Sequence, residues 1–143
     1  MVDKRIIDTI IAEALGEGDA GMTAVAYTIL NRSQNRGLTP LQVVKQKSQY
    51  SGYSNPGSSV SRAMSDPQVR ARVERIWNNV QTGAVPDPTQ GGEYFHTTNI
   101  SPGWAKGVNK NGATTLGNHV FYLGQGQINP SSPEVPPRRP ETA

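Results

Sequence analysis

The sequence predicts a predominantly helical α+β fold with a small β-hairpin, and three observations support this. Apolar residues recur at helical spacing over residues 3–44 and again over 67–82. Two short runs rich in aromatic and β-branched residues, 93–97 and 119–123, are typical of strands. The chain has 143 residues, of which 34% are hydrophobic, and this suffices for one domain with one modest core.

The N-terminal part contains three predicted helices. Asp3 can cap the first, which has an isoleucine-rich face and ends at Gly16. The second covers roughly residues 21–34, where apolar side chains form one stripe. Thr39 and Pro40 begin a short third helix, because threonine caps a helix well and proline suits its first turn.

The remaining elements follow a segment that is almost free of charge. This segment, 46–61, is predicted to be an ordered surface loop. A helix then begins at Asp66 and stops at Gly83. The two strand candidates, 93–97 and 119–123, are separated by a glycine-rich stretch, so we expect them to pair as a looped β-hairpin.

One folded domain is expected over residues 1–124, followed by a tail over 125–143. The tail carries five prolines and little that could be buried, so it is expected to be disordered. There is no cysteine, which excludes disulfides, thiolate nucleophiles and cysteine zinc sites.

Charge and hydropathy limit the classes of partner. The net charge is +3, and the basic residues are scattered rather than clustered into an arm that binds nucleic acid. No apolar run is long enough to span a bilayer. The N-terminus lacks the pattern of a secretory signal. We therefore expect no nucleic-acid partner, no membrane insertion and a monomeric protein.

Glu13 is the first candidate for chemistry, because it lies in the last turn of the first predicted helix between small and apolar residues. The negative end of the helix dipole and partial burial would both raise its pKa. A general acid that protonates a glycosidic oxygen needs such a carboxyl group. A glutamate paired with a base such as Arg32 is the alternative, and the residue pattern alone leaves it open.

Other side chains suggest further sites. Glu17 lies four residues after Glu13 and would share its face if the helix continued. His96 and His119, on the two strand candidates, could bind zinc with a carboxylate such as Glu93. The aromatic side chains could line a groove, since flat rings stack on sugars, or could simply pack in the core. These aromatic candidates are Tyr50, Tyr53, Tyr94, Phe95 and Trp104.

Several blocks of the sequence together resemble a known family. The first block runs from Ile11 to Glu17 and is followed by 21–32. The later blocks are Gln49-Tyr50-Ser51, Tyr94-Phe95-His96-Thr97, Ser101-Pro102-Gly103-Trp104-Ala105 and 117–122, in the same order as in the family. Over residues 5–124 the chain resembles the SleB-type cell-wall hydrolases, also called spore cortex-lytic enzymes.

The resemblance implies a small fold similar to lytic transglycosylases and lysozymes. It implies cleavage of the β-1,4 bond between N-acetylmuramic acid and N-acetylglucosamine, with a 1,6-anhydro sugar as product. Glu13 would be the single acid and base, with no metal and no cofactor. By position, the residues implied for the groove or its support are Glu17, Tyr50, Tyr94, His96, Trp104 and His119.

The resemblance also implies the partners and the place of action. Peptidoglycan glycan strands would be the substrate, in the periplasm or cell wall, and the partners could include an inhibitor or a delivery protein. Without a signal, delivery would fall to phage lysis, a phage-like particle or a secretion system. A hydrolytic muramidase, a zinc amidase or peptidase that uses His96 and His119, and a non-catalytic wall-binding or structural module are the alternatives.

Overall fold

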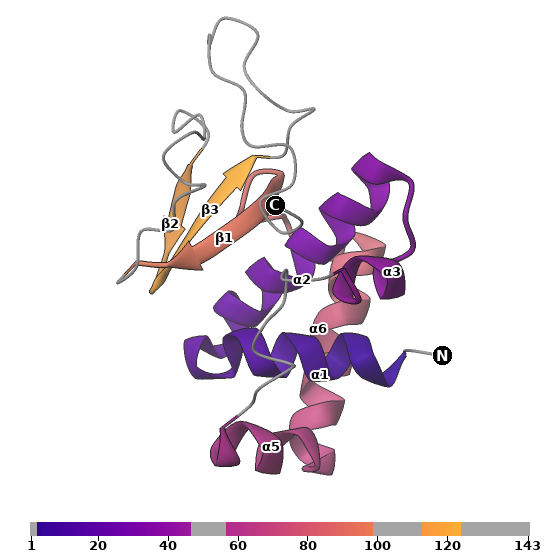
Figure 1. Ribbon diagram of the computed structural model, residues 1–143, viewed down its shortest axis with the longest axis vertical. Coiled ribbons are helices and arrows are strands. Elements are labelled where there is room, and N and C mark those ends of the chain that lie inside the picture. Colours follow the sequence, from indigo (N-terminus) through magenta and orange to yellow (C-terminus); the bar gives the residue numbers. More distant parts are fainter. Residues whose placement is uncertain (1–2, 47–56, 99–112, 124–143) are drawn as a thin grey trace, which may run out of the picture.

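The structure is a computed structural model, and it describes residues 3–46, 57–98 and 113–123. In chain order its elements are α1 (Lys4–Ala14), the 3₁₀ turn η1 (Leu15–Glu17), α2 (Gly18–Arg36), α3 (Pro40–Val44), α5 (Ser58–Met64), α6 (Pro67–Thr82), β1 (Gly92–Thr97), β2 (Thr114–Leu116) and β3 (His119–Leu123). Figure 1 shows the helices gathered together and the sheet beside α2. The predicted, predominantly helical α+β fold is confirmed.

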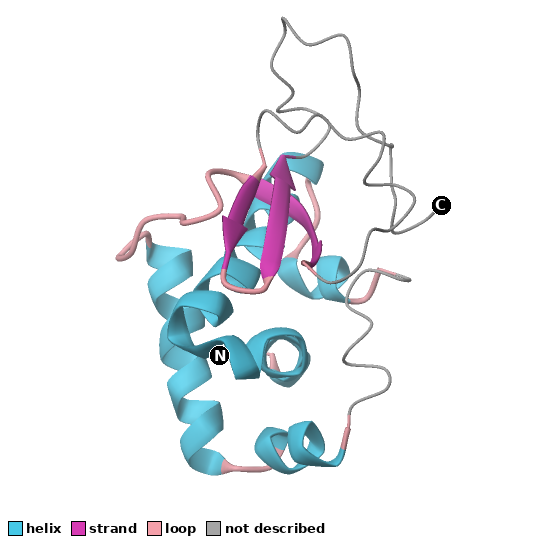
Figure 2. Ribbon diagram, turned by 90° about the vertical axis from the view of Figure 1, so that its left-hand side faces the viewer, coloured by secondary structure: helices cyan, strands magenta, loops and turns pink. Residues whose placement is uncertain are grey.

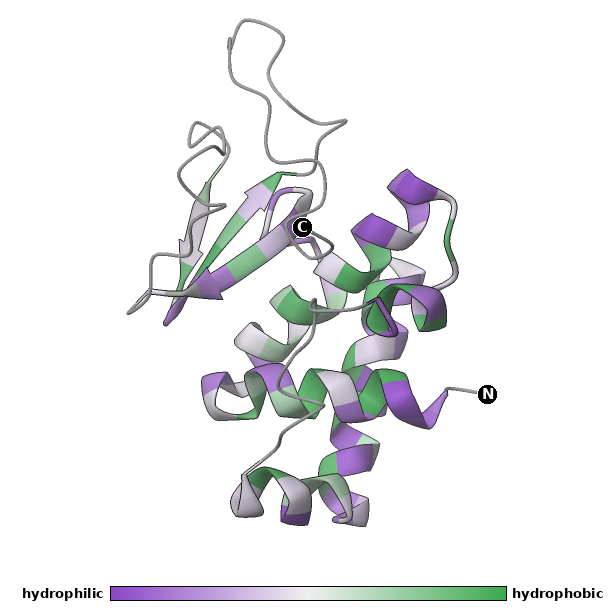
Figure 3. Ribbon diagram, in the orientation of Figure 1, coloured by the Kyte–Doolittle hydropathy of each residue, from purple (hydrophilic) through white to green (hydrophobic). Residues whose placement is uncertain are grey.

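Helix α2 is the centre of the molecule, in contact with α1, α3, α6 and β1. Every residue from Ala24 to Ile29 is buried, so this helix is covered all round rather than along one stripe. Its C-terminal turns are hydrophilic, as Figure 3 shows, and they lie against the sheet. The predicted helix over 21–34 is longer at both ends, from Gly18 to Arg36, and the left-handed Gly37 caps it.

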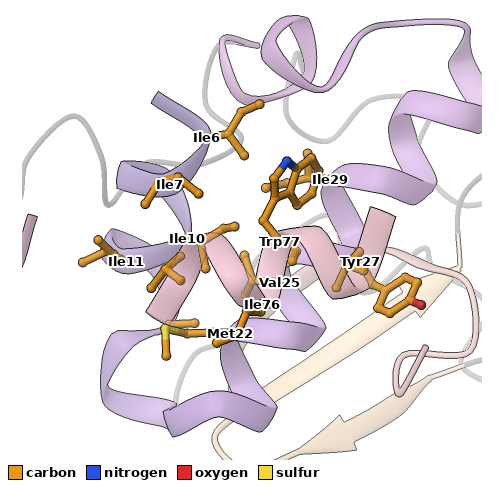
Figure 4. Packing of buried hydrophobic residues seen from close by; sticks show 14 of the residues in the cluster. Ile6, Ile7, Ile10, Ile11, Met22, Val25, Tyr27, Ile29, Ile76 and Trp77 are labelled. Carbon is orange, nitrogen blue, oxygen red and sulfur yellow. The ribbon is translucent and has the colours of Figure 1, made fainter. Parts of the chain in front are cut away.

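The main core lies between α1, α2 and α6. Trp77 of α6 is 1% exposed and packs in one cluster with Ile10 of α1 and Ile29 of α2 (Figure 4). The isoleucines of α1 are buried because their spacing puts them on the face toward α2 and α6. Asp8, on the same helix, is buried as well, and it is paired with Lys4 and Arg70.

The sheet has three antiparallel strands in the order β1-β3-β2. The predicted pairing of 93–97 with 119–123 is confirmed, and Phe95 lies opposite Phe121. Strand β2 was not predicted from the sequence. It joins β3 through a two-residue turn, Gly117-Asn118, in which Gly117 has a φ of +57°. Figure 2 shows the sheet at one end of the helical part of the molecule.

The region after α3 differs from the prediction of a loop over 46–61. Helix α5 begins at Ser58, so the last residues of that predicted loop are helical, and residues 47–56 lie outside the described part. Among the described helices, none combines the length and the apolar character needed to cross a bilayer.

Candidate active site

Glu13 lies at the corner where the chain turns from α1 into α2. It is the penultimate residue of α1, and it is half-buried next to the buried Ala14. The backbone of Ala14 leaves the helical region, with φ −143° and ψ 10°, and the turn η1 follows before α2 begins. Glu13 and Glu17 therefore do not share the face of one continuous helix, which the paired arrangement of the two carboxylates would require.

Glu17 reaches from this corner to the sheet. Its Oε1 accepts a hydrogen bond from the backbone N–H of Asn118 (2.9 Å), and its Oε2 accepts one from Asn118 Nδ2 (3.1 Å). The backbone hydrogen bond first, and the side-chain one second, lower the pKa of Glu17 below its ordinary value of 4.5. The carboxylate is therefore ionised at neutral pH, with both oxygens bound to the turn between β2 and β3.

His119 lies next to this carboxylate, at the start of β3. Its ring is 5% exposed and meets Phe95 edge-on, with 5.4 Å between the ring centroids. Its Nδ1 is 3.8 Å from Glu17 Oε1, which is longer than a hydrogen bond. Burial lowers the pKa of His119 below its ordinary value of 6.5, and the charge of Glu17 only partly opposes this. The imidazole is therefore neutral at pH 7.

His96 lies on the other face of the sheet. It is opposite Val120 in the strand register, whereas His119 is opposite Thr97, so the two histidines alternate in side-chain direction. His96 Nε2 is 2.8 Å from Tyr122 Oη, and the two rings are stacked. The two imidazoles thus do not converge as ligands of one zinc ion. In residues 3–46, 57–98 and 113–123 no group of three or more potential ligands is placed to hold a metal.

Tyr94 is buried where α2 meets β1, with 1% of its surface exposed. Arg36 Nη2 donates a hydrogen bond to its hydroxyl (2.7 Å), and the guanidinium carbon of Arg32 is 4.9 Å from its ring centre. Arg32 Nε also donates to the carbonyl oxygen of Glu93 (2.6 Å), while the Glu93 carboxylate accepts from Arg36 and Asn35. Tyr94 thus supports the strand in this conformation rather than facing an open groove.

A compact turn before β1 is also bound to α2. Asn31 Nδ2 donates to Asp87 Oδ2 (2.9 Å) and to the carbonyl oxygen of Gly92 (3.0 Å). The same carboxylate accepts from the backbone of Thr89 (2.8 Å) and of Gly91 (2.9 Å). No local sequence pattern singles out Asp87 as the acceptor. The block over 21–32, which ends in Asn31 and Arg32, therefore has a structural explanation: its last two residues dock β1.

A hollow of about 200 Å³ lies between the α1–α2 corner and the sheet. Its walls come from the start of α2, from the loop before β1 and from the β2–β3 turn. The lining residues are Glu17, Ala20, Gly21, Pro88, Leu116 and Gly117. Apart from the Glu17 carboxylate this lining is small and apolar. The corner that carries Glu13 and the sheet thus face each other across open space.

The predicted site residues divide into three groups. Glu17 and His119 are brought together by the fold, and Glu13 lies four residues before Glu17 on the same corner. Tyr94 and His96 are placed elsewhere on the sheet. The other two, Tyr50 and Trp104, lie outside the described residues.

Asn118 is the residue at this site that the sequence prediction missed. A signal was present, because Gly-Asn between two short β-rich runs is typical of a two-residue hairpin turn. The run before it, Thr114–Leu116, has only three residues, which made the strand hard to recognise. Its partner Glu17 is 101 residues away in the chain, and no local pattern links the two.

Comparison with known proteins gives one match. A family model described as Cell Wall Hydrolase matches residues 16–122, which is more than half of the chain. The match includes Glu17, His96 and His119, and it starts three residues after Glu13. Searches of curated proteins and of solved structures gave no match.

Proposed function

The chain belongs to the cell wall hydrolase family, and we propose that it cuts peptidoglycan glycan strands with Glu13 as its acid and base. Family membership makes peptidoglycan the substrate and the cell wall the place of action. The proposal goes further in two respects. The bond that is cut is the β-1,4 linkage from N-acetylmuramic acid to N-acetylglucosamine, and the reaction is a lytic transglycosylation.

The position of Glu13 supports its role, whereas most other acidic residues of the described part have structural tasks. Seven of those in the described part of the chain cap a helix or bind a specific partner. They are Asp3, Asp8, Glu17, Asp19, Asp66, Asp87 and Glu93. Glu74 is exposed on α6, and Glu134 and Glu141 lie outside the described residues. Glu13 is half-buried on the same corner as Glu17, which lines the hollow, and this position supports its proposed role.

Glu17 is poorly suited to donate a proton. Its pKa is lowered, and both of its oxygens accept hydrogen bonds from Asn118. The bonds of Glu17 to Asn118 favour Glu13 over Glu17 as the group that exchanges a proton with substrate.

In the proposed reaction the carboxyl group of Glu13 protonates the glycosidic oxygen as the bond to the anomeric carbon of muramic acid breaks. The resulting carboxylate then takes the proton of the muramyl 6-hydroxyl, whose oxygen bonds to the anomeric carbon. The products are a 1,6-anhydromuramyl end and a new N-acetylglucosamine end. Glu13 regains its proton, so the reaction needs no second carboxylate and consumes no water.

Hydrolysis is the second candidate, and the description of the matched family as hydrolases favours it. Glu13 would act in the same way on the leaving group, but a water molecule would attack the anomeric carbon. The product would then be a reducing muramic acid end. The two courses differ in the attacking oxygen alone, so product analysis separates them.

The test compares the wild type with Glu13→Gln, and with Glu74→Gln as a matched control on the exposed face of α6. Purified sacculi are digested, and the glycan ends are identified by mass spectrometry. We expect anhydromuramyl ends from the wild type and the control, and a loss of rate of at least about a thousandfold for Glu13→Gln. Full activity of a folded Glu13→Gln protein would exclude Glu13 as the acid.

A further inference from the structure

We propose that Glu17 is a positioning residue, which fixes the corner carrying Glu13 against the β2–β3 turn and so sets the spacing between helices and sheet. The inference rests on the proposed role of Glu13. It assigns to Glu17 a task in the reaction that requires no contact with the sugar.

The contact between Glu17 and Asn118 is bidentate. One carboxylate oxygen binds the backbone N–H and the other binds the side-chain amide, at 2.9 and 3.1 Å. Two hydrogen bonds accepted by one carboxylate restrict both the distance and the direction of approach. The turn is thereby held relative to Glu17, and Glu17 is the last residue of η1, the 3₁₀ turn that follows α1.

The corner itself is tightly built, so a restraint on Glu17 is passed on to Glu13. The backbone N–H of Leu15 in η1 donates to the carbonyl oxygen of Ile11 in α1, and that of Gly18 donates to the carbonyl oxygen of Leu15. Gly21, in the first turns of α2, has no room for a side chain, because a Cβ there would lie 2.2 Å from Glu17 Cβ. The end of α1, the turn η1 and the start of α2 therefore move together.

Asn31 and Arg32 dock β1 onto α2, but at the β2–β3 turn open space leaves the Glu17–Asn118 contact to set the spacing. The hollow of about 200 Å³ separates Ala20 and Gly21 on the corner from Pro88 and Leu116 on the sheet side. Apolar packing cannot fix a distance across a gap, whereas a charged hydrogen-bonded bridge can. Glu17 is the polar member of the lining and spans this gap to Asn118.

The charge state of Glu17 suits this task. Because its pKa is below 4.5, the carboxylate keeps its full acceptor capacity throughout the neutral range. The nearby His119 is neutral at pH 7, and its Nδ1 is too far away to compete for Oε1. The two donors of Asn118 therefore remain the partners that define the position of Glu17.

The test uses changes that exchange donors and acceptors across the contact. Glu17→Ala removes both acceptors, and Asn118→Asp sets a second carboxylate against the first. Glu17→Gln keeps an oxygen for the backbone N–H, and its amide can donate to an oxygen at position 118. The double variant Glu17→Gln/Asn118→Asp restores complementary groups. Asp19→Ala, which breaks an exposed ion pair with Arg72 two residues from Glu17, is the matched control.

Rates are measured on soluble glycan strands well below the melting temperature of each variant. We expect Glu17→Ala and Asn118→Asp to lower kcat by about tenfold or more, with KM changed by less than about threefold. Glu17→Gln and the double variant should stay within about threefold of the wild type, because the bridge is retained. Asp19→Ala should be unaffected.

Three results would overturn the inference. One is an unchanged kcat in folded Asn118→Asp, which leaves Glu17 itself intact. Another is an inactive Glu17→Gln that the second substitution does not rescue, since that would make the carboxylate part of the chemistry. The third is a lower melting temperature of Glu17→Ala and Asn118→Asp with no change in kcat. Glu13→Gln is assayed alongside, so an active Glu13→Gln, or a wild type that does not cut glycan, would refute the proposed function instead.

Discussion

A methyl group on Gly117 would lie 2.7 Å from Oε1 of Glu17. Gly117 also has a φ of +57°, so a side chain here would be strained even in open space. The glycine thus serves two purposes, which are the tight turn into β3 and the close approach of the carboxylate. Gly37, at the end of α2, has a similar φ of +66° but nothing within 4 Å of its would-be Cβ.

The pair Gly117→Ala and Gly37→Ala therefore separates backbone strain from displacement of Glu17. Both should lower the free energy of unfolding by about 1 kcal/mol through the left-handed backbone. Gly117→Ala should in addition lower kcat by about tenfold, because Glu17 must move away from Asn118. Urea unfolding and kinetics on the same preparations check this, and equal activity of the two variants would contradict it.

Removal of the buried carboxylate from the ion pair between Arg36 and Glu93 should destabilise the protein more than removal of a carboxylate from an exposed pair. Glu93 is 2% exposed and accepts from Arg36 Nε (3.1 Å) and Asn35 Nδ2 (2.8 Å). Glu93→Ala leaves Arg36 half-buried without its counter-charge, and we expect a loss of about 3 kcal/mol in the free energy of unfolding. Asp19→Ala breaks an exposed pair and should cost less than about 1 kcal/mol. Urea denaturation of both variants measures the difference, and similar losses would show that burial does not matter here.

Much of the fold follows from local sequence patterns. The isoleucines of α1 determine its buried face, and Asp66 with Pro67 marks the start of α6 as predicted. The first turn of α2 was missed, because the Gly18–Ala20 segment has no apolar periodicity and is held by the corner instead. Strand β2 was missed because three residues carry little signal, and pairing with β3 stabilises them.

The candidate site was only partly predictable for a related reason. Glu13 and Glu17 could be selected from one short segment, but the different roles that we propose for them depend on the break at Ala14 and on a turn 101 residues away. The zinc alternative for His96 and His119 was plausible from composition. The strand register places the two histidines on opposite faces of the sheet, which disfavours a shared zinc ion. Register is set by how two strands pair and cannot be seen in either strand alone.

Activity should be insensitive to metal removal if Glu13 acts as proposed. Proton exchange by a carboxyl group supplies both the acid and the base, and His96 and His119 point to opposite faces of the sheet. Cleavage of purified sacculi is measured before and after dialysis against EDTA, with and without added zinc. We expect rates equal within about twofold. A loss that zinc restores would revive the metal-dependent alternative.

Finally, His119 should make the protein less stable in mild acid. Its pKa in the folded state is below 6.5, so as the pH falls through 6.5 the unfolded chain takes up a proton there before the folded chain does. Stability then falls with decreasing pH until the folded state is protonated as well, by at most about 1.4 kcal/mol per pH unit. In His119→Gln this contribution is absent. Urea unfolding between about pH 5 and pH 8 should give a steeper pH dependence for the wild type than for the variant. Parallel curves would mean that the imidazole has the same pKa in both states, because burial beside Phe95 and Phe121 is then balanced by the charge of Glu17.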